Sequence, residues 1–193
     1  MAMEVNIKNH TNGSIAGVTR DFQLKTQAES LSLQHFISRE YGQTYQVIGT
    51  TDTLTAATIP ILHITNDDPE RLLVFSFIRA GIVDPNATLP NANDYIQLGV
   101  GATVTGGTAV TPVNTNRSSG KVATVTAVHS TPTSAGTFTE MDRYYPKEDG
   151  HEQVWNKSGS LILGLNDTFE ARIVSTSTAG VAWARFTFMM LDK

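Results

Sequence analysis

Apolar and polar residues alternate through the last third of the chain, and this alternation predicts β-strands. In residues 181–191 one face would carry small and aromatic apolar side chains, namely Ala182, Ala184, Phe186, Phe188 and Met190. Successive side chains of a strand point to opposite faces, so this segment fits a strand packed in a core on one side and partly covered on the other. Residues 169–173 alternate apolar residues with Glu170 and Arg172, which predicts a strand with one buried face. With a short strand at 161–165, we expect the last third to form an antiparallel meander.

Further strand patterns recur along the chain, separated by Gly, Asn, Asp and Pro. Segments 59–65 and 72–78 are expected to pair across the turn 66–70, and the second segment, apolar on both faces, is predicted to be a central strand. Pro60 lacks an amide donor, so its strand should begin there or lie at a sheet edge. Other predicted strands cover 18–25, 45–48, 95–100 and 122–129. About ten short strands predict an all-β fold, an antiparallel β-sandwich with a jelly roll favoured.

The N-terminal part departs from this pattern. Residues 29–41 place apolar residues at helical spacing before Gly42, yet part of the same segment also alternates. We therefore expect at most one short helix. Residues 1–17 are rich in Asn, Gly and Ser and are predicted to form an arm that becomes ordered only on a partner, while residues 18–193 form the β domain.

Composition narrows the classes of function. Charged residues make up 17% of the 193 residues, against about 25% in typical domains, and roughly one residue in seven is Thr, which favours strands. The net charge of −4 lacks the basic surplus of a non-specific nucleic-acid binder. No apolar run approaches the roughly 20 residues of a membrane helix, and the N-terminus lacks a signal-peptide pattern. The absence of cysteine excludes disulfides, thiolate zinc sites and thiol nucleophiles.

Two patterns suggest ligand chemistry, and each has a simpler interpretation. The glycines of 99–107 resemble a phosphate-binding loop, but the required Lys and the following helix are missing, so turn or bulge glycines are the better interpretation. Asp67, Asp68 and Glu70 offer oxygen ligands for calcium without the spacing of an EF-hand, and a hairpin turn explains them more simply.

Acidic residues gather in a second long loop, beside Tyr144 and Tyr145. They are joined by a histidine, the set being Glu140, Asp142, Glu148, Asp149, His151 and Glu152. A carboxylate pair for glycoside hydrolysis could lie among them, although a solvated loop is the simpler interpretation. Long segments at 80–120 and 130–159, rich in Gly, Pro, Asn and Thr, are expected to be ordered loops that contact neighbours.

The sequence also shows no clear pattern of residues for nucleophilic catalysis or for metal binding. The five histidines show no metal-ligand spacing; they are His10, His35, His63, His129 and His151. No Gly-x-Ser-x-Gly elbow precedes a helix, while a Ser-His-Asp triad assembled across the fold stays open. We therefore predict that the protein is not an enzyme, with no catalytic, cofactor-binding or metal-binding residues and no cofactor.

Two stretches resemble small virion proteins of tailed bacteriophages. The first, GTAVTPVNTNRSSGKVATVTAVHSTPT at 107–133, has a Thr-Pro-Val-Asn motif and then Asn-Arg, leading into a strand and a Thr/Pro loop. The second, SGSLILGLNDTFEARIVSTSTAGVAWARFTFMML at 158–191, is similar to their closing strands, and the block that ends in SREYGQTYQVIG is also similar. The resemblance covers about half of the chain and carries over no functional residue, because the binding surface of such proteins is a shape rather than a motif.

The resemblance implies a capsid decoration (cement) protein with a β-sandwich or jelly-roll fold. Such a protein would bind the major capsid protein of the same phage and stabilise the outer shell. It would be a homo-oligomer, with a trimer favoured by the local threefold symmetry of a capsid lattice. We expect it in the virion, at the capsid surface, assembled in the host cytoplasm, with no direct contact with nucleic acid or membrane.

Two alternatives stay open. A tail, neck or baseplate component would share the fold and the composition. A free carbohydrate-binding module or an unrecognised hydrolase is the other alternative. For a sugar module only Trp155 and Trp183 offer flat stacking platforms, and Trp183 is expected to pack in the core.

Overall fold

The computed structural model describes residues 37–83, 93–146 and 151–193, which belong to one compact unit, Leu33–Lys193. The predicted arm at 1–17 and the predicted strand at 18–25 lie outside the described residues, as does most of the predicted helix at 29–41. Of that helix the structure describes one π-helical turn, Ile37–Tyr41. In the described part of the chain, no helix is long and apolar enough to cross a membrane.

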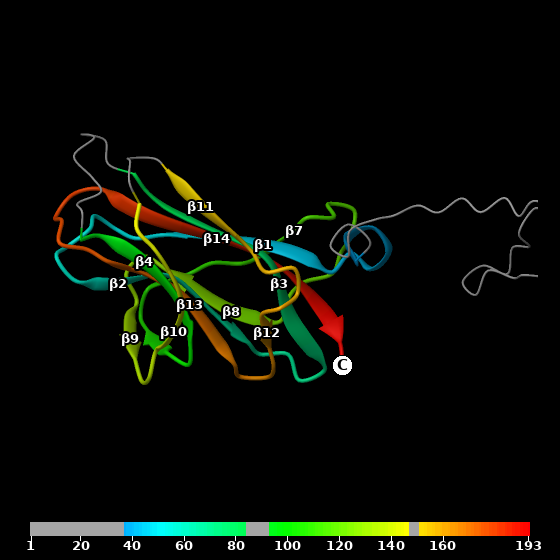
Figure 1. The fold of residues 1–193 in the computed structure, drawn as a ribbon. Coiled ribbons are helices and arrows are strands. Elements are labelled where there is room, and N and C mark those ends of the chain that lie inside the picture. Colours follow the sequence, from blue (N-terminus) through cyan, green and yellow to red (C-terminus); the bar gives the residue numbers. More distant parts are fainter. Residues whose placement is uncertain (1–36, 84–92, 147–150) are drawn as a thin grey trace, which may run out of the picture. The chain divides into compact units, whose positions relative to one another are not determined.

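Two antiparallel sheets make up the fold (Figure 1). Sheet 1 has the order β11-β3-β14-β1-β7, and β12 also pairs with β3. Its strands are β1 (Thr44–Thr50), β3 (Arg71–Val83), β7 (Val113–Asn114), β11 (Glu152–Asn156), β12 (Ile162–Leu163) and β14 (Val181–Asp192). Sheet 2 has the order β10-β4-β13-β2-β8-β6. Its strands are β2 (Thr58–Asn66), β4 (Tyr95–Val100), β6 (Thr108–Ala109), β8 (Val125–His129), β10 (Thr139–Tyr144) and β13 (Thr168–Val174).

Eight of these strands have the connectivity of a jelly roll. In chain order they are β1, β2, β3, β4, β10, β11, β13 and β14. The first pairs with the last, the second with the seventh, the third with the sixth and the fourth with the fifth. One long hairpin folded over into two sheets gives this pattern, which is the double Greek key of a jelly roll. The predicted all-β antiparallel sandwich with jelly-roll topology is confirmed.

The connection between β4 and β10 is a long insertion that carries five short strands. Within it, β7 pairs with β1 and β8 pairs with β2, so the insertion extends both sheets on the same side of the sandwich. The remaining strands β5 (Thr103–Thr105) and β9 (Thr133–Ala135) pair only with each other. Because β6, β7 and β8 lie between them in the chain, these two strands are not a hairpin, and we call this two-stranded element the β5–β9 ribbon.

Aromatic rings from both sheets form the centre of the core. The ring centroid of Phe75 on β3 lies 4.8 Å from that of Phe169 on β13 and 5.6 Å from that of Phe186 on β14. Tilted and edge-to-face contacts of this kind add to the free energy of apolar burial. The predicted core face of β14, from Ala182 to Met190, is fully buried, and β3 is a central strand as expected.

Two predicted pairings are wrong. Residues 59–65 and 72–78 become β2 and β3, which lie in different sheets, and β12, β13 and β14 form no meander because β13 belongs to sheet 2. A short connection brings consecutive strands close together, but it does not decide whether they share hydrogen bonds or face each other across the core. Pro60 lies near the start of β2, as expected, beside a register shift between Ala171 and Arg172.

Candidate functional site

The outer face of sheet 2 carries a group of polar side chains that the sequence pattern places opposite the core. On β13, Phe169 and Ala171 are buried in the core, so the alternating Glu170 and Arg172 project to the other side of the sheet. In the register of the sheet, Glu170 lies opposite His63 of β2, and Arg172 lies opposite Gln97 of β4. We call His63, Gln97, Glu140, Glu170 and Arg172 the outer-face cluster.

The β5–β9 ribbon and the residues next to it cover the middle of this cluster. Ser134 Oγ donates a hydrogen bond to Glu170 Oε2 at 3.2 Å, and His63 Nε2 donates to the carbonyl oxygen of Ala102 at 3.1 Å. As a result Glu170 is only 1% exposed and His63 only 2% exposed. The ring of Phe138 also lies over Gly99, where a Cβ would clash with that ring and with the carbonyl oxygen of Thr139.

Burial changes the titration of both covered groups. It raises the pKa of Glu170 to about 7, against smaller lowering effects of the Ser134 hydrogen bond and the Arg172 charge. Burial also lowers the pKa of His63, and the hydrogen bond to Ala102 only partly offsets this. Glu170 Oε1 and His63 Nδ1 have no hydrogen-bond partner among the described residues. Near neutral pH His63 is therefore neutral and about half of Glu170 is protonated, and both side chains are incompletely bonded among the described residues.

Arg172 keeps its charge at the edge of the β5–β9 ribbon. Its guanidinium carbon lies 3.4 Å from the centroid of the Phe138 ring, and its Nε donates to Gln97 Oε1 at 2.9 Å. Gln97 in turn donates to Glu140, whose carboxylate forms a 2.7 Å ion pair with Arg143. The neutral amide of Gln97 thus separates the Arg143–Glu140 pair from Arg172, which has no ion pair among the described residues.

A cleft of about 670 Å³ opens beside Arg172. It lies between the β1–β2 connection, which contributes Asp52 and Thr53, and the segment that includes β9, which contributes Thr133 and Ser134. Six of its lining residues carry hydroxyl groups and four are apolar, while Asp52 and Arg172 add a carboxylate and a guanidinium. Such a lining offers several hydrogen-bonding groups to a polar ligand.

A different surface covers the outer face of sheet 1. Four aliphatic side chains are well exposed there, at 41–52%: Ile48, Val83, Val113 and Val154. Four outward residues form one row across the sheet. From β11 to β1 the row is Val154, Arg79, Arg185 and Ile48, each opposite the next in the register. Arg79 pairs with Glu152, whereas Arg185 has a buried Nε without a partner among the described residues. We call these residues, with Phe77 and Trp183, the sheet 1 face.

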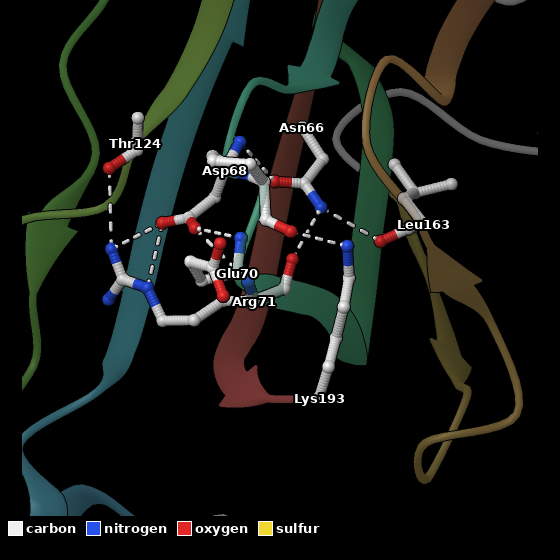
Figure 2. Close-up of polar contacts among 8 residues, drawn as sticks. Asn66, Asp68, Glu70, Arg71, Thr124, Leu163 and Lys193 are labelled. Atoms are coloured by element: carbon white, nitrogen blue, oxygen red, sulfur yellow. Dashed lines mark hydrogen bonds and ion pairs between the residues drawn. The ribbon is translucent and has the colours of Figure 1, made fainter.

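The candidate calcium residues belong to a closed turn network instead (Figure 2). Asp68 Oδ1 accepts hydrogen bonds from the amides of Glu70 and Arg71, and its Oδ2 forms a 2.6 Å ion pair with Arg71. Asn66 donates to the carbonyl oxygens of Arg71 and Leu163 and accepts from the amide of Asp68. Because the oxygens of Asp68 already have partners, the structure supports a turn and not a calcium site at this carboxylate. The expected hairpin is wrong, because the turn joins β2 and β3, which lie in different sheets.

The charge and contacts of Asp68 follow from this network. Burial alone would raise the pKa of Asp68, but the hydrogen bond from Arg71, the amide of Glu70 and the Arg71 charge together hold it below its usual value. Arg71 also donates to Thr124, and Lys193 donates to the carbonyl oxygen of Pro69, so the network ties the turn to the insertion and to the C-terminal residue (Figure 2).

The other candidate residues from the sequence lie apart from one another. Glu140 and Asp142 on β10 pair with Arg143 and Lys157, and Glu152 on β11 pairs with Arg79 in the other sheet. His129 contacts Ser130, and His151 contacts Tyr144. Glu148, Asp149, His10 and His35 lie outside the described residues. Among those described, no three His, Asp or Glu side chains form a group that could hold a metal ion.

Two further sequence interpretations have clear outcomes. Gly101, Gly106 and Gly107 have positive φ values between 72° and 88°, which confirms the turn interpretation of the glycines there. The expectation for Trp183 is wrong: it lies half-buried on the outer face of sheet 1, whereas Trp155 is buried in the core. Trp155 occupies an inward position of β11, so it is not available as a platform for sugar stacking.

The burial of Glu170 was missed by the sequence analysis. The alternation of β13 correctly assigns Glu170 to the face away from the core, and such a face is usually solvated. Its hydrogen-bond partner is Ser134, which lies 36 positions earlier in the chain and carries no signal that it returns to this face. The neighbouring His63 is likewise bonded to the distant Ala102. Comparison of the chain with protein-family models, curated proteins and solved structures found no match.

Proposed function

We propose that the protein is a non-enzymatic structural protein of a tailed-phage virion that binds the outer capsid surface as a decoration protein. Its partner is the major capsid protein of the same phage. It acts as a homo-oligomer, with a trimer favoured because it matches the local threefold symmetry of a capsid lattice. The sequence resemblance and the jelly-roll fold both support this proposal, although the fold alone is compatible with many functions.

The single observation that carries the proposal is the sheet 1 face. Exposed aliphatic side chains lie on neighbouring strands, with Arg79 and Arg185 between Val154 and Ile48. Exposed apolar residues that gather on one face mark interaction sites, and arginine is enriched in the contact regions of protein interfaces. The sheet 1 face spans several neighbouring strands, a width that suits contact with another protein.

The first experiment is the copy number of the protein in purified virions, relative to the major capsid protein. A ratio close to that of the capsid subunit supports a decoration protein distributed over the whole shell. A few copies per particle would move the protein to the tail, neck or baseplate, and complete absence from virions would overturn the proposal.

A pair of valine variants tests the face itself. Val154→Asp puts a charge on the sheet 1 face, and we expect it to reduce binding to undecorated capsids by at least about tenfold. Val122→Asp is the matched control, because Val122 is 73% exposed and lies in the insertion rather than on this face. Equal binding by both variants, with wild-type melting temperatures, would show that the sheet 1 face is not the docking surface.

A further inference from the structure

The cleft beside Arg172 has a positive charge held at a fixed position. Stacking on Phe138 and the hydrogen bond to Gln97 hold the guanidinium, but they use only its face and its Nε. Its two terminal nitrogens have no partner among the described residues, although they can form a two-pronged pair with a carboxylate. An arginine that is held in place and lacks an ion pair is arranged to receive an anion.

Among the described residues, neither Glu140 nor Glu170 forms an ion pair with Arg172, although the charges of both act on it at longer range. Glu140 is paired with Arg143, and Glu170 is turned under the β5–β9 ribbon, where it accepts from Ser134. The terminal nitrogens of Arg172 are therefore left for a carboxylate that a bound molecule supplies.

The opposite side of the cleft has a different chemistry. Asp52 accepts a hydrogen bond from Thr131 at its Oδ2, and its Oδ1 has no partner among the described residues. Thr53, Thr55 and Thr133 are exposed and add hydroxyl groups to the lining. A carboxylate repels a phosphate or any other multiply charged anion, but it is a good acceptor for the hydroxyls of a sugar.

The aromatic residue of the cleft argues against a neutral sugar. Neutral sugars usually need an open aromatic face for stacking, but the Phe138 ring is covered by Arg172 and contacts Gly99. A ligand with one carboxylate and several hydroxyls uses Arg172 and Asp52 together. We propose that this cleft binds an acidic saccharide, such as a uronic or sialic acid unit, with its carboxylate on Arg172 and its hydroxyls on Asp52 and the threonines.

This site lies on sheet 2, whereas the proposed capsid contact lies on sheet 1, so the two proposals stand or fall separately. A decoration protein with this cleft would present it outward and could hold the particle on acidic polysaccharides. The sugar could come from a bacterial surface polymer or from an animal glycan, and both sources share the carboxylate and the hydroxyls.

Calorimetric or NMR titration of the full chain tests the proposal. The acidic probes are a galacturonic acid trimer and sialyllactose, and the neutral controls are maltotriose and lactose. We expect at least one acidic probe to bind at least about tenfold more tightly than its neutral counterpart, and salt to weaken this binding. An acetylated peptide ending in Asp probes the other source of a carboxylate.

Variants on the two faces complete the test. Arg172→Gln should lose at least about tenfold in affinity, while Arg185→Gln on the sheet 1 face should bind like wild type. Asp52→Asn, in an exposed connection where folding is at little risk, should also weaken saccharide binding. The proposal is overturned if neither acidic probe binds, if neutral sugars or the peptide bind as tightly, or if Arg172→Gln and Asp52→Asn, both folded, keep wild-type affinity.

Discussion

Two polar regions contact β2 at different points, and they differ in how completely their side chains are hydrogen-bonded and paired. At the end of β2, the turn network of Asn66, Asp68 and Arg71 joins an acid, an amide and an arginine so that the Asp68 carboxylate and the Asn66 amide are fully engaged (Figure 2). In the middle of β2, the outer-face cluster has the same kinds of side chain. Within the described part of the chain, however, Glu170 and His63 keep unpartnered atoms and Arg172 has no ion pair.

The difference lies in where the partners come from. In the turn network most of the partners lie within six consecutive residues, so the chain can satisfy them while it closes the turn. In the outer-face cluster the partners come from four strands of sheet 2 and from the β5–β9 ribbon, whose backbones are placed by other contacts. Local polar networks therefore stabilise this fold, while the assembled cluster keeps the capacity to titrate and to bind a ligand.

The largest expected effect is the loss of the Asn66 side chain. Asn66→Ala removes three hydrogen bonds, among them those to the carbonyl oxygens of Arg71 and Leu163, so we expect a loss of about 3 kcal/mol in unfolding free energy. Chemical denaturation at pH 7 measures this loss. The matched control is Asn156→Ala, at an exposed position, which should change stability by less than about 0.5 kcal/mol. Similar stabilities for the two variants would contradict the ranking of the two regions.

In the outer-face cluster the expected effect has the opposite sign. The pKa of Glu170 is raised from the usual 4.5 to about 7, so the folded state binds a proton more tightly than the unfolded state. Its contribution to stability is present below pH 4.5 and is lost as the pH rises through about 7. Glu170→Gln removes this loss and should be about 2 kcal/mol more stable than wild type at pH 8, and equally stable near pH 4.

Denaturation curves at the two pH values measure this difference. Glu152→Gln, at an exposed position, serves as the control and should show no such gain at pH 8. If Glu170→Gln were less stable than wild type at pH 8, the charged carboxylate would be favoured under the β5–β9 ribbon.

Asp68 sharpens the comparison at acid pH. Its pKa lies below the usual value, so the stability that it contributes is present above pH 3.8 and is lost as the pH falls through the folded-state pKa. Asp68→Asn should be about 1.5 kcal/mol less stable than wild type at pH 7, and the gap should close below pH 4. Melting temperatures across this range give the measurement, with the exposed Asp192→Asn as control. A gap that stays constant with pH would indicate a steric effect instead of a lost charge.

The smallest expected effect belongs to His63. Its pKa is lowered from 6.5 by burial, so wild-type stability should fall as the pH drops below 6.5, opposite in slope to the contribution of Glu170. His63→Gln keeps a donor for Ala102 and should lose this dependence, with a gain of about 0.5–1 kcal/mol at pH 5.5 relative to wild type. His151→Gln, an exposed control, should behave like wild type in the same series of melting curves.

Much of the fold followed from local patterns. The alternation in β14 and the apolar run of β3 identified the two longest strands of sheet 1, because their side chains report directly on which face is buried. Strand pairing was harder: β2 and β3 are joined by a short turn, yet they face each other across the core. Local sequence fixes the turn through Asn66 and Asp68, but the choice of sheet depends on partners elsewhere in the chain.

The candidate site depended even more on distant contacts. The sequence placed Glu170 and Arg172 on an outward face correctly, but their burial and pairing depend on Ser134, Phe138 and Gln97. Trp155 shows the same limit, because β11 is short and nothing within it reveals which of its two faces meets the opposite sheet. Trp183 differs: the alternation of β14 placed it opposite the predicted core face, so its half-buried position agrees with the alternation and not with the core packing expected for it.

The insertion has one more consequence, for self-association at high local concentration. Without β6, β7 and β8, the strands β1 and β2 would present long rows of unpaired amides and carbonyls, which are templates for edge-to-edge aggregation. With them, each sheet ends on that side in a strand of only two residues. The opposite borders, β10 and β11, carry Glu140, Asp142, Arg143 and Glu152, whose charges oppose the addition of a further strand. Many copies of this chain can therefore be crowded together and keep their sheets separate, so that any contact between copies forms through faces and loops.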